Sequence, residues 1–432
     1  MLLTAQQLLV YLLNNFNVDG RRIGCFFTAA TLFSHVSSKV IEMINTPVSP
    51  WPSFTEEEAN AVSRILLSNK VNYWTGIQGR EFENEFSTWC GSEHAVAVAN
   101  GTLALDLALR VLGIEGGDEV IVTSRTFLAS ASSIVTAGAK PVFVDVDRNT
   151  QNITTETIEK AITQKTKAII CVHLAGWPCE MDEIMTLAEE HNLYVIEDCA
   201  QAHGATYKGR RVGSIGHIGA WSFCQDKIMT TGGEGGMVTT NDPSFWKAMW
   251  SYKDHGKSYD AVYNKKHPPG FRWLHESFGT NWRLTEMQSA IGRIQLQRMP
   301  EWTKRRQENA SVISETCRTL PALRVPQVPE YIQHACYKHY VFVRPQMLKN
   351  GWSRDRIVDE IVSRGVPCYQ GTCSEVYLEK AFDGTDYRPK EALPIAKELG
   401  ETSLMFLVHP TLLEHEIKKT AAVVVEVLSL AS

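Results

Sequence analysis

The stretch AVAVANGTLALDLALRVLG, residues 95–113, joins a continuous apolar run to a helical pattern of apolar side chains. The run AVAVAN has the character of a strand that is buried on both faces of a sheet. Asn100 ends this run, and Gly101 and Thr102 open the helix that follows. A strand that passes directly into a helix is the repeating unit of α/β proteins.

Six more apolar runs follow the first one, and helical patterns such as MDEIMTLAEEHN (181–192) lie between several of them. They are EVIVTS (119–124), PVFVDV (141–146), AIICVHL (168–174), LYVIED (193–198), GAWSFC (219–224) and GGMVTTN (235–241). This alternation of strands and helices predicts an α/β fold with a mainly parallel seven-stranded sheet.

The C-terminal part of the chain shows a second, smaller α/β pattern. A long amphipathic helix is expected around 284–310, with Pro300 kinking or dividing it. A strand at 339–345 and a helix at 353–365 follow, and the chain closes on a further helix. We therefore predict a large domain at 51–299, a small C-terminal domain at 300–432, and an N-terminal extension of unknown role at 1–50.

Composition excludes several classes of protein. The 432 residues are 44% hydrophobic and 21% charged, which is typical of a globular chain. The net charge of −5 provides no positive field for nucleic acid or an anionic membrane, so neither is an expected partner. None of the ten cysteines forms a C-x-x-C pair, so we predict no metal site and expect reduced thiols in the cytoplasm.

The N-terminus is unusually apolar. MLLTAQQLLVYLLNNF (1–16) is too short to span a bilayer, and the apolar stretch after Arg21 and Arg22 is shorter still. A signal peptide is the less favoured interpretation, because the cysteine usage is that of a cytoplasmic protein.

Three motifs carry residues suited to chemistry, although each also has an ordinary structural explanation. Asp198 ends the apolar run of VIEDCAQAHGA (195–205), where it faces a ligand crevice or caps a helix. Lys227 precedes a glycine-dense loop, and it is either reactive or simply solvated. The helix that begins at Gly101 and Thr102 either directs its free N–H groups at a phosphate or is part of an ordinary strand–turn–helix connection.

Taken together, the three motifs indicate that one ligand binds to all of them. That ligand has a phosphate, a basic ring atom opposite a carboxylate, and a carbonyl within reach of a lysine. Pyridoxal 5'-phosphate has all three groups, because its ring nitrogen needs an acidic partner and its aldehyde condenses with lysine.

The chain resembles the DegT/DnrJ/StrS family of pyridoxal-phosphate sugar aminotransferases over roughly residues 55–300. Besides the motifs above, the matching stretches include VIVTSRTFLASASSIVTAGAKPVFVDVD (120–147), SFCQDKIMTTGGEGGMVTTND (222–242) and GTNWRLTEMQSAIGRIQL (279–296). The resemblance implies the aspartate-aminotransferase-like fold, known as fold type I. It also implies a homodimer with active sites at the subunit interface.

The resemblance assigns the chemistry to two residues. Lys227 matches the lysine that binds the cofactor covalently and then moves the proton, and Asp198 matches the aspartate that keeps the pyridine nitrogen protonated. Gln201 resembles the residue beside the 3-hydroxyl group of the cofactor.

The remaining cofactor contacts also follow from the resemblance. Gly101, Thr102 and Ser222 match the residues that surround the phosphate, and Phe127 matches the aromatic ring stacked on the cofactor. Asn281 resembles an asparagine that reaches the phosphate of the neighbouring subunit.

His255, in KDHG, falls in a segment that the resemblance places near the substrate. The chain also departs from the family pattern. Trp282 stands where tyrosine is frequent, and CYQGTCSEVYLEKAF (368–382) replaces the usual HYP-type segment. These changes fall where sugar and nucleotide are expected, so they affect substrate identity more than chemistry.

The predicted activity is therefore transamination. An amino acid, expected to be L-glutamate, gives its amino group to a nucleotide-linked keto-deoxy sugar, with pyridoxamine 5'-phosphate as the intermediate form of the cofactor. The expected product is an amino sugar for a surface polysaccharide such as O-antigen.

Two alternatives stay open. A nucleotide-sugar dehydratase of the same fold has histidine in place of the lysine, so Lys227 argues against it. A non-catalytic regulatory homologue is disfavoured because Lys227, Asp198 and the phosphate-binding residues occur together.

Overall fold

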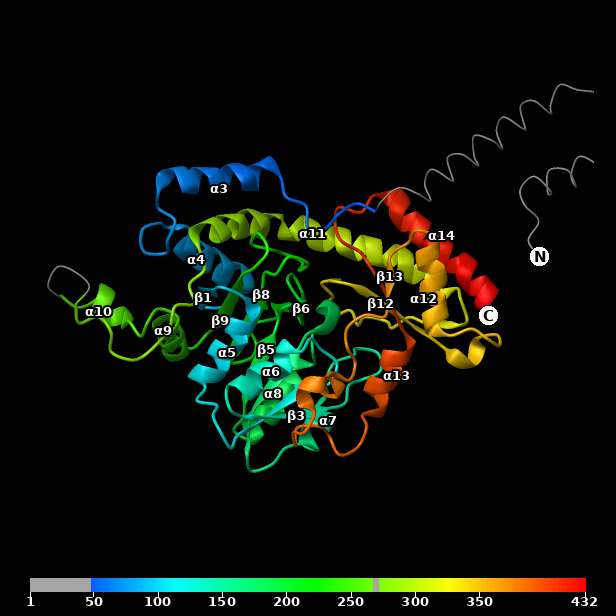
Figure 1. Ribbon diagram of the computed structural model, residues 1–432, viewed down its shortest axis with the longest axis horizontal. Helices are drawn as coiled ribbons and strands as arrows, with labels where there is room; N and C mark the ends of the chain where they lie inside the picture. The colour runs from blue at the N-terminus through cyan, green and yellow to red at the C-terminus, as the bar shows by residue number, and fades with distance from the viewer. Residues whose placement is uncertain (1–47, 267–271) are drawn as a thin grey trace, which may run out of the picture. The chain divides into compact units, whose positions relative to one another are not determined.

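The structure, a computed structural model, describes residues 48–266 and 272–432 (Figure 1). The N-terminal extension predicted at 1–50 lies almost wholly outside the described residues. Among the described residues, no helix combines the length and the apolar composition that crossing a membrane requires.

The predicted seven-stranded sheet is present, and each of the seven apolar runs forms one of its strands. The strands are β1 (His94–Val98), β2 (Glu119–Thr123), β3 (Lys140–Val144), β4 (Thr166–Val172), β5 (Tyr194–Asp198), β8 (Ile218–Ser222) and β9 (Gly236–Thr240). Their order in the sheet is β1-β9-β8-β5-β4-β2-β3. Only β9 runs antiparallel to its neighbours, so the sheet is mainly parallel as predicted.

Helices cover both faces of this sheet. They are α4 (Gln78–Cys90), α5 (Gly101–Val111), α6 (Ala129–Thr136), α7 (Thr155–Glu159), α8 (Met181–Glu190) and α9 (Pro243–Tyr252). Along β1, Val96 belongs to the apolar cluster that contains Leu107 of α5. Its neighbour Ala97 belongs to the cluster that contains Phe82 of α4. Successive side chains of a strand point to opposite faces, so both faces of β1 are buried.

Helix α11 (Glu286–Arg318) is the longest helix that the structure describes. It begins at a capping box, in which Thr285 Oγ1 accepts from the N–H of Gln288 while the Gln288 side chain accepts from the N–H of Thr285. Pro300 lies inside α11 and does not divide it, and the helix continues past the predicted end at residue 310. The predicted domain boundary at 299/300 falls within this helix, so that division stays a prediction.

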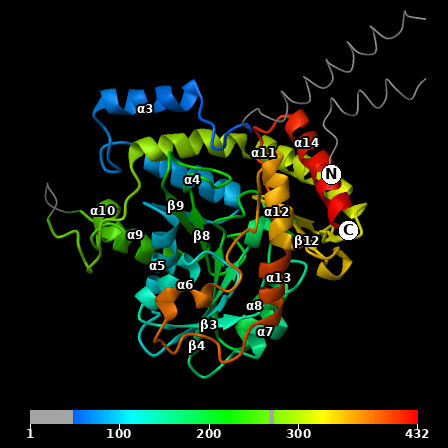
Figure 2. The ribbon, with the colours of Figure 1, turned by 45° about the vertical axis from the view of Figure 1, so that its right-hand side comes forward.

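Figures 1 and 2 show α11 running across one end of the sheet domain toward the C-terminal helices. It packs against α3 (Glu56–Ser68) and α4, and it also packs against α14 (Glu414–Ala431). A short helix, α10 (Tyr259–Tyr263), lies between α9 and α11 in the sequence.

The C-terminal part forms a four-stranded antiparallel sheet in the order β10-β12-β14-β13. Its strands are β10 (Leu323–Arg324), β12 (His339–Val343), β13 (Cys368–Tyr369) and β14 (Ser403–Phe406). Helices α11, α12 (Arg354–Ser363) and α14 bury an apolar core against it, and α13 (Pro394–Thr402) precedes β14. The strand predicted at 339–345 and the helix predicted at 353–365 are thus confirmed as β12 and α12.

A small three-stranded sheet connects the two parts of the chain. Its strands are β6 (Thr206–Tyr207), β7 (Arg210–Arg211) and β11 (Ile332–Gln333), in the order β11-β6-β7. Because β11 comes from the C-terminal part, this pairing places the segment 332–340 against the seven-stranded sheet domain.

Candidate functional site

A cavity of about 840 Å³ opens where β1, β5 and β8 end, and we call it the sheet-edge cavity. Ligands bind at this edge in open α/β sheets, because the loops after the strands leave a crevice there. Seven of the predicted site residues line it: Gly101, Thr102, Phe127, Asp198, Gln201, Ser222 and Lys227. The structure therefore brings together three motifs that lie far apart in the sequence.

Asp198 is the last residue of β5, and its side chain is buried. Ser130 Oγ of α6 donates a hydrogen bond to Oδ2 at 2.7 Å, and the N–H of Ala200 donates to Oδ1 at 3.1 Å. Residues 199–205 form turns, so Asp198 caps no helix. The carboxylate is fixed in place at the cavity wall. Sequence reasoning missed Ser130, because nothing local in ASASS marks one serine as a partner of Asp198.

Lys227 follows β8 in a loop that other parts of the chain hold in place. Its carbonyl oxygen accepts a hydrogen bond from Trp51 Nε1 at 2.8 Å. Its amine lies 5.4 Å from the centroid of the Tyr337 ring. Within the described residues no carboxylate forms an ion pair with this amine, and the side chain lines the sheet-edge cavity.

Asp226 stands next to Lys227 and accepts a hydrogen bond from the Tyr337 hydroxyl. Burial favours the neutral form of Asp226, but the charge of Lys227 and the bond from Tyr337 outweigh it and lower the pKa of this carboxyl. Asp226 therefore stays ionised and adds negative charge beside the lysine.

The start of α5 forms another wall of the cavity. Asn100 caps the helix by accepting from the N–H of Leu103 at 2.9 Å. The N–H groups of Gly101 and Thr102, the first two helical residues, have no acceptor within the helix and carry the positive end of its dipole. A Cβ added to Gly101 would lie 2.5 Å from Ser222 Cβ, so only glycine allows the helix to start this close to β8.

Two further predicted residues lie where a flat ring would bind. Phe127 lines the cavity with 69% of its surface exposed, which is unusual for a phenylalanine and leaves its ring free to stack. Gln201 is held by the N–H of Ala175, which donates to its Oε1 at 2.8 Å. Pyridoxal 5'-phosphate fits this set of groups. They are a carboxylate, a lysine without an ion-pair partner among the described residues, an exposed aromatic ring and a helix N-terminus with free N–H groups.

The C-terminal part closes the cavity with residues that the sequence did not single out. Tyr337, Lys338, Tyr340 and Tyr369 all line it. Burial lowers the pKa of Lys338 to about 8, although the nearby charge of Asp226 acts in the opposite direction. No sequence signal identified these residues, because only the pairing of β11 with β6 brings their segment to the sheet edge.

Asn281 and His255 lie outside the sheet-edge cavity of their own chain. Both are exposed, and the two segments lie side by side, with the N–H of His255 donating to the carbonyl oxygen of Thr280 at 2.9 Å. Among the described residues, Asn281 Oδ1 accepts from the N–H of Arg283, at 3.4 Å. Their predicted roles, one at the partner's phosphate and one at the substrate, stay predictions.

One buried group of potential metal ligands occurs among the described residues, namely His173, Glu197 and Cys199. Glu197 already accepts from the N–H groups of Gly213, Ile215 and Gly216, at 2.6–2.9 Å. His173 Nδ1 accepts from the N–H of Cys179, so its Nε2 carries the proton that it shares with Glu197. These bonds occupy the lone pairs that a metal would need. The three side chains are therefore explained by the hydrogen bonds that they form within the fold.

A family model, the DegT/DnrJ/EryC1/StrS aminotransferase family, matches residues 52–425. The chain belongs to this family. The match extends through the C-terminal part, well beyond the stretch at 55–300 in which the sequence motifs lie.

Curated relatives of similar length support the assignment. GDP-perosamine synthase of Escherichia coli O157:H7 is 36% identical over 370 residues, which cover 85% of this chain and 94% of that protein. The dTDP-3-amino-3,4,6-trideoxy-alpha-D-glucose transaminase of Streptomyces venezuelae is 35% identical, over 82% of this chain and 87% of that protein.

Solved structures support the same family assignment. An aminotransferase from Psychrobacter cryohalolentis is 65% identical, with a TM-score of 0.88 over 89% of this chain and 99% of that one. S. venezuelae DesV, solved in complex with a ketimine intermediate, is 32% identical with a TM-score of 0.78, over 88% and 98%. The aspartate-aminotransferase-like fold, the pyridoxal-phosphate dependence and the class of sugar aminotransferase are thereby confirmed.

Proposed function

We propose that this chain transfers an amino group from L-glutamate to the keto group of a nucleotide-linked keto-deoxy sugar. The observation that carries the proposal is the sheet-edge cavity, in which Asp198, Lys227 and the start of α5 surround one space. The named activities of the curated relatives support a nucleotide-linked sugar as the acceptor. The amino sugar would serve a surface polysaccharide such as O-antigen, and one relative is a spore coat polysaccharide biosynthesis protein of Bacillus subtilis.

Each site residue has one physical task in this reaction. When bound, pyridoxal 5'-phosphate supplies an electron sink that stabilises negative charge on the carbon that loses its proton. Asp198, a buried side chain held by Ser130 and Ala200, would keep a proton on the ring nitrogen of the bound cofactor. Lys227, with no ion-pair partner in the described part of the chain, is free to take a proton and to return it.

The other residues bind and orient. The open N–H groups of Gly101 and Thr102, with Ser222, would bind the phosphate, and Phe127 would stack on the ring. The cavity also extends to Lys338 and Tyr369 of the C-terminal part. A cationic Lys338 would attract the diphosphate of a nucleotide sugar.

The cytoplasm is the proposed location of the reaction. The nine cysteines that the structure describes are all free thiols, and most of them are buried. This usage is typical of a reducing compartment.

A panel of keto sugars tests the proposal. Purified holoenzyme is incubated with L-glutamate and with GDP-, dTDP- or UDP-linked 3-keto or 4-keto deoxy sugars, and products are identified by mass. We expect one acceptor to give an amino sugar together with 2-oxoglutarate, and Lys227→Ala to give neither. Loss of water from the sugar without gain of nitrogen would support a dehydratase, and no turnover of any acceptor would support a regulatory homologue.

A further inference from the structure

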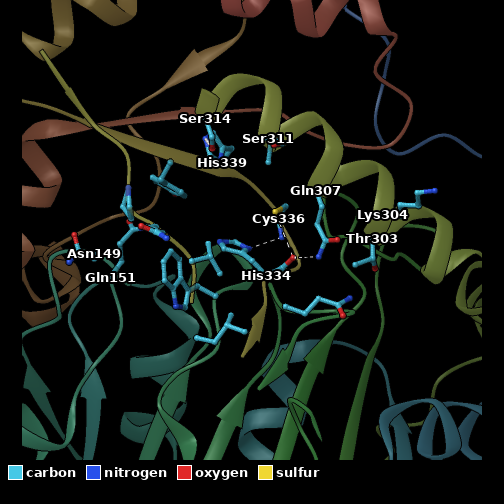
Figure 3. A pocket seen from close by; sticks show the side chains of 18 of the residues that line it. Asn149, Gln151, Thr303, Lys304, Gln307, Ser311, Ser314, His334, Cys336 and His339 are labelled. Atoms are coloured by element: carbon cyan, nitrogen blue, oxygen red, sulfur yellow. Dashed lines mark hydrogen bonds between the residues drawn. The ribbon is translucent and has the colours of Figure 1, made fainter. Parts of the chain in front are cut away.

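A second cavity, of about 650 Å³, lies along α11 on the other side of the segment 332–340. We call it the α11 groove, and Figure 3 shows the side chains that line it. The described lining residues come from α11, from the segment 326–340, from the loops after β3 and β4, and from Trp89 and Arg211. Its volume is within the range of small-ligand sites.

The side of α11 that faces the groove is mainly polar, although Met299, Pro300 and Ala310 also line it. Thr303, Gln307, Ser311 and Ser314 recur at helical spacing and all line the cavity (Figure 3). A helix that packs on a protein body normally turns an apolar stripe inward. Hydroxyl and amide groups in that place are suited to binding a polyhydroxylated molecule.

The charges in the groove are of one sign. None of the described residues that line it is acidic, whereas Arg211, Lys304 and Arg318 are basic. Arg211 and Arg318 form no ion pair with any described carboxylate, and Lys304 contacts Glu308 only at 3.9 Å. The residues that line the groove therefore carry a net positive charge, which suits an anion, although Glu315 accepts a hydrogen bond from Ser311 at 2.9 Å beside them.

Two buried hydrogen-bond donors of the groove lack partners within the described residues. They are the indole N–H groups of Trp89 and Trp177, and Trp177 is only 5% exposed. A buried N–H without an acceptor is costly, so it marks a place where a bound group could accept a hydrogen bond. Burial also lowers the pKa of His334 to about 3, so its ring stays neutral, and its Nδ1 accepts from Cys336 while Nε2 keeps the proton.

We propose that the α11 groove binds a phosphate-bearing sugar of nucleotide-sugar size, at a site separate from the sheet-edge cavity. Arginine and lysine side chains bind the phosphates, and the hydroxyl, amide and indole groups bind the sugar. The choice of a nucleotide-linked sugar rests on the proposed function, because such compounds are then the substrates and products of the same enzyme.

The two cavities share a wall. His334 and Cys336 line the α11 groove, while Tyr337 and Lys338 of the same segment line the sheet-edge cavity. The N–H of Tyr337 donates to the carbonyl oxygen of Ala175 at 2.9 Å, and Gln307 of α11 donates to the carbonyl oxygen of His334 at 2.9 Å. A ligand in the groove therefore contacts the segment that carries the tyrosine beside Lys227.

The test counts bound probe molecules per chain. Holoenzyme is titrated calorimetrically with GDP-mannose and with UDP-N-acetylglucosamine, neither of which has a keto group to aminate. Ser311→Trp fills the groove from an exposed helix position, and Val312→Trp adds the same bulk one residue along, outside the groove. We expect Ser311→Trp to bind one probe fewer than the wild type, and Val312→Trp to match the wild type.

Further arms separate the remaining outcomes. If Ser311→Trp does not fold, Arg318→Gln is used instead. This substitution should lower the affinity of the groove for the probe about tenfold and reduce the salt dependence of binding. Equal probe counts in all variants would overturn the site, and equal competition by inorganic pyrophosphate would overturn its specificity for a sugar. Transamination of the keto sugar is measured in parallel. We expect Ser311→Trp to bind no probe in the groove and to keep the wild-type turnover. Absence of turnover in the wild type would show a failure of the proposed function, independently of the probe count.

Discussion

Asp198 is the residue whose environment most directly determines its chemistry. Both of its carboxylate oxygens already accept a hydrogen bond, from Ser130 and from Ala200, and the side chain is buried at the cavity wall. Asp198→Asn keeps the shape of the side chain but removes the charge proposed to hold a proton on the ring nitrogen. We expect near-normal cofactor binding and a loss of several orders of magnitude in kcat, because a neutral pyridine is a poor electron sink.

A matched control for this change is Ser130→Ala. It removes one donor to Asp198 but keeps the carboxyl group itself, so kcat should fall only about tenfold, the value of one hydrogen bond. Cofactor absorbance and single-turnover rates give both quantities. Turnover of Asp198→Asn close to that of the wild type would show that Asp198 has a structural role only.

Lys338 leads to a pH prediction. Burial lowers its pKa to about 8, and a lysine carries its charge only below its pKa. The attraction for a substrate diphosphate is therefore present at neutral pH and lost as the pH rises through about 8. We expect the KM for the keto sugar to increase over that interval.

Two substitutions at the same position test this explanation. Lys338→Arg keeps its charge throughout, because arginine does not deprotonate in this range, so its KM should stay flat with pH. Lys338→Met should show a raised KM at every pH. A wild-type KM that is independent of pH between about 7 and 9 would argue against any contact between Lys338 and the substrate.

At this scale the sequence predicted the residues that carry strong motifs and missed their partners. Lys227 and Asp198 stand out because Asp198 ends one apolar strand and Lys227 comes shortly after another, and both line the sheet-edge cavity. Ser130, Tyr337 and Trp51 do not stand out, because their importance arises only from contacts across the fold. Roles for Asn281 and His255 stay predictions, since neither lies in the cavity of its own chain.

At the scale of elements, the start of α5 lies unusually close to β8. A Cβ on residue 101 would meet Ser222 Cβ at 2.5 Å and Ser222 Oγ at 2.9 Å. Gly101→Ala should therefore move the helix start away from the phosphate position. We expect a stability loss of about 1–3 kcal/mol and weaker cofactor binding.

Gly116→Ala is the control for this change, because a Cβ there would have no atom closer than 3.9 Å. Thermal unfolding of the apoprotein and cofactor titration separate the two effects. If Gly101→Ala binds the cofactor as tightly as Gly116→Ala does, the start of α5 is not the phosphate site.

Elements buried on both sides were the easiest to predict. Each of the seven strands is a continuous apolar run, because both faces of a covered parallel sheet are apolar. The two-residue strands β6, β7 and β11 were not predicted, since so short a segment has no periodicity to detect. Pro300 was expected to kink or divide α11; it does not divide the helix, which continues past it and packs against α3, α4 and α14.

At the scale of the whole molecule, the functional site combines distant parts of the chain. The sheet domain supplies the residues proposed to bind the cofactor, and the C-terminal part supplies Tyr337 and Lys338. Trp51, near the start of the described chain, holds the carbonyl group of Lys227. Such combinations follow from tertiary pairing, here of β11 with β6, and no local pattern in the sequence encodes them. This is the physical reason why the motifs were predictable and the closing wall was not.

A second subunit is predicted to complete the site. Asn281 is exposed, and its side chain accepts one long hydrogen bond, from the N–H of Arg283 at 3.4 Å. It does not line the sheet-edge cavity that contains Gly101 and Thr102. The family resemblance places this residue at the phosphate of a neighbouring subunit, so a homodimer with shared active sites is the prediction to test.

Mixing two inactive variants tests whether the sites are shared. Lys227→Ala removes the reactive amine, and Asn281→Ala removes the contact proposed to cross the interface. If each site takes its lysine from one subunit and its asparagine from the other, a heterodimer has one site with both lesions and one intact site. After subunit exchange, shown with a tagged copy, each heterodimer should therefore regain about half of the activity of a wild-type dimer. No recovery despite demonstrated exchange would mean that Asn281 acts within its own subunit or outside the site, where it would satisfy only the backbone of its own loop.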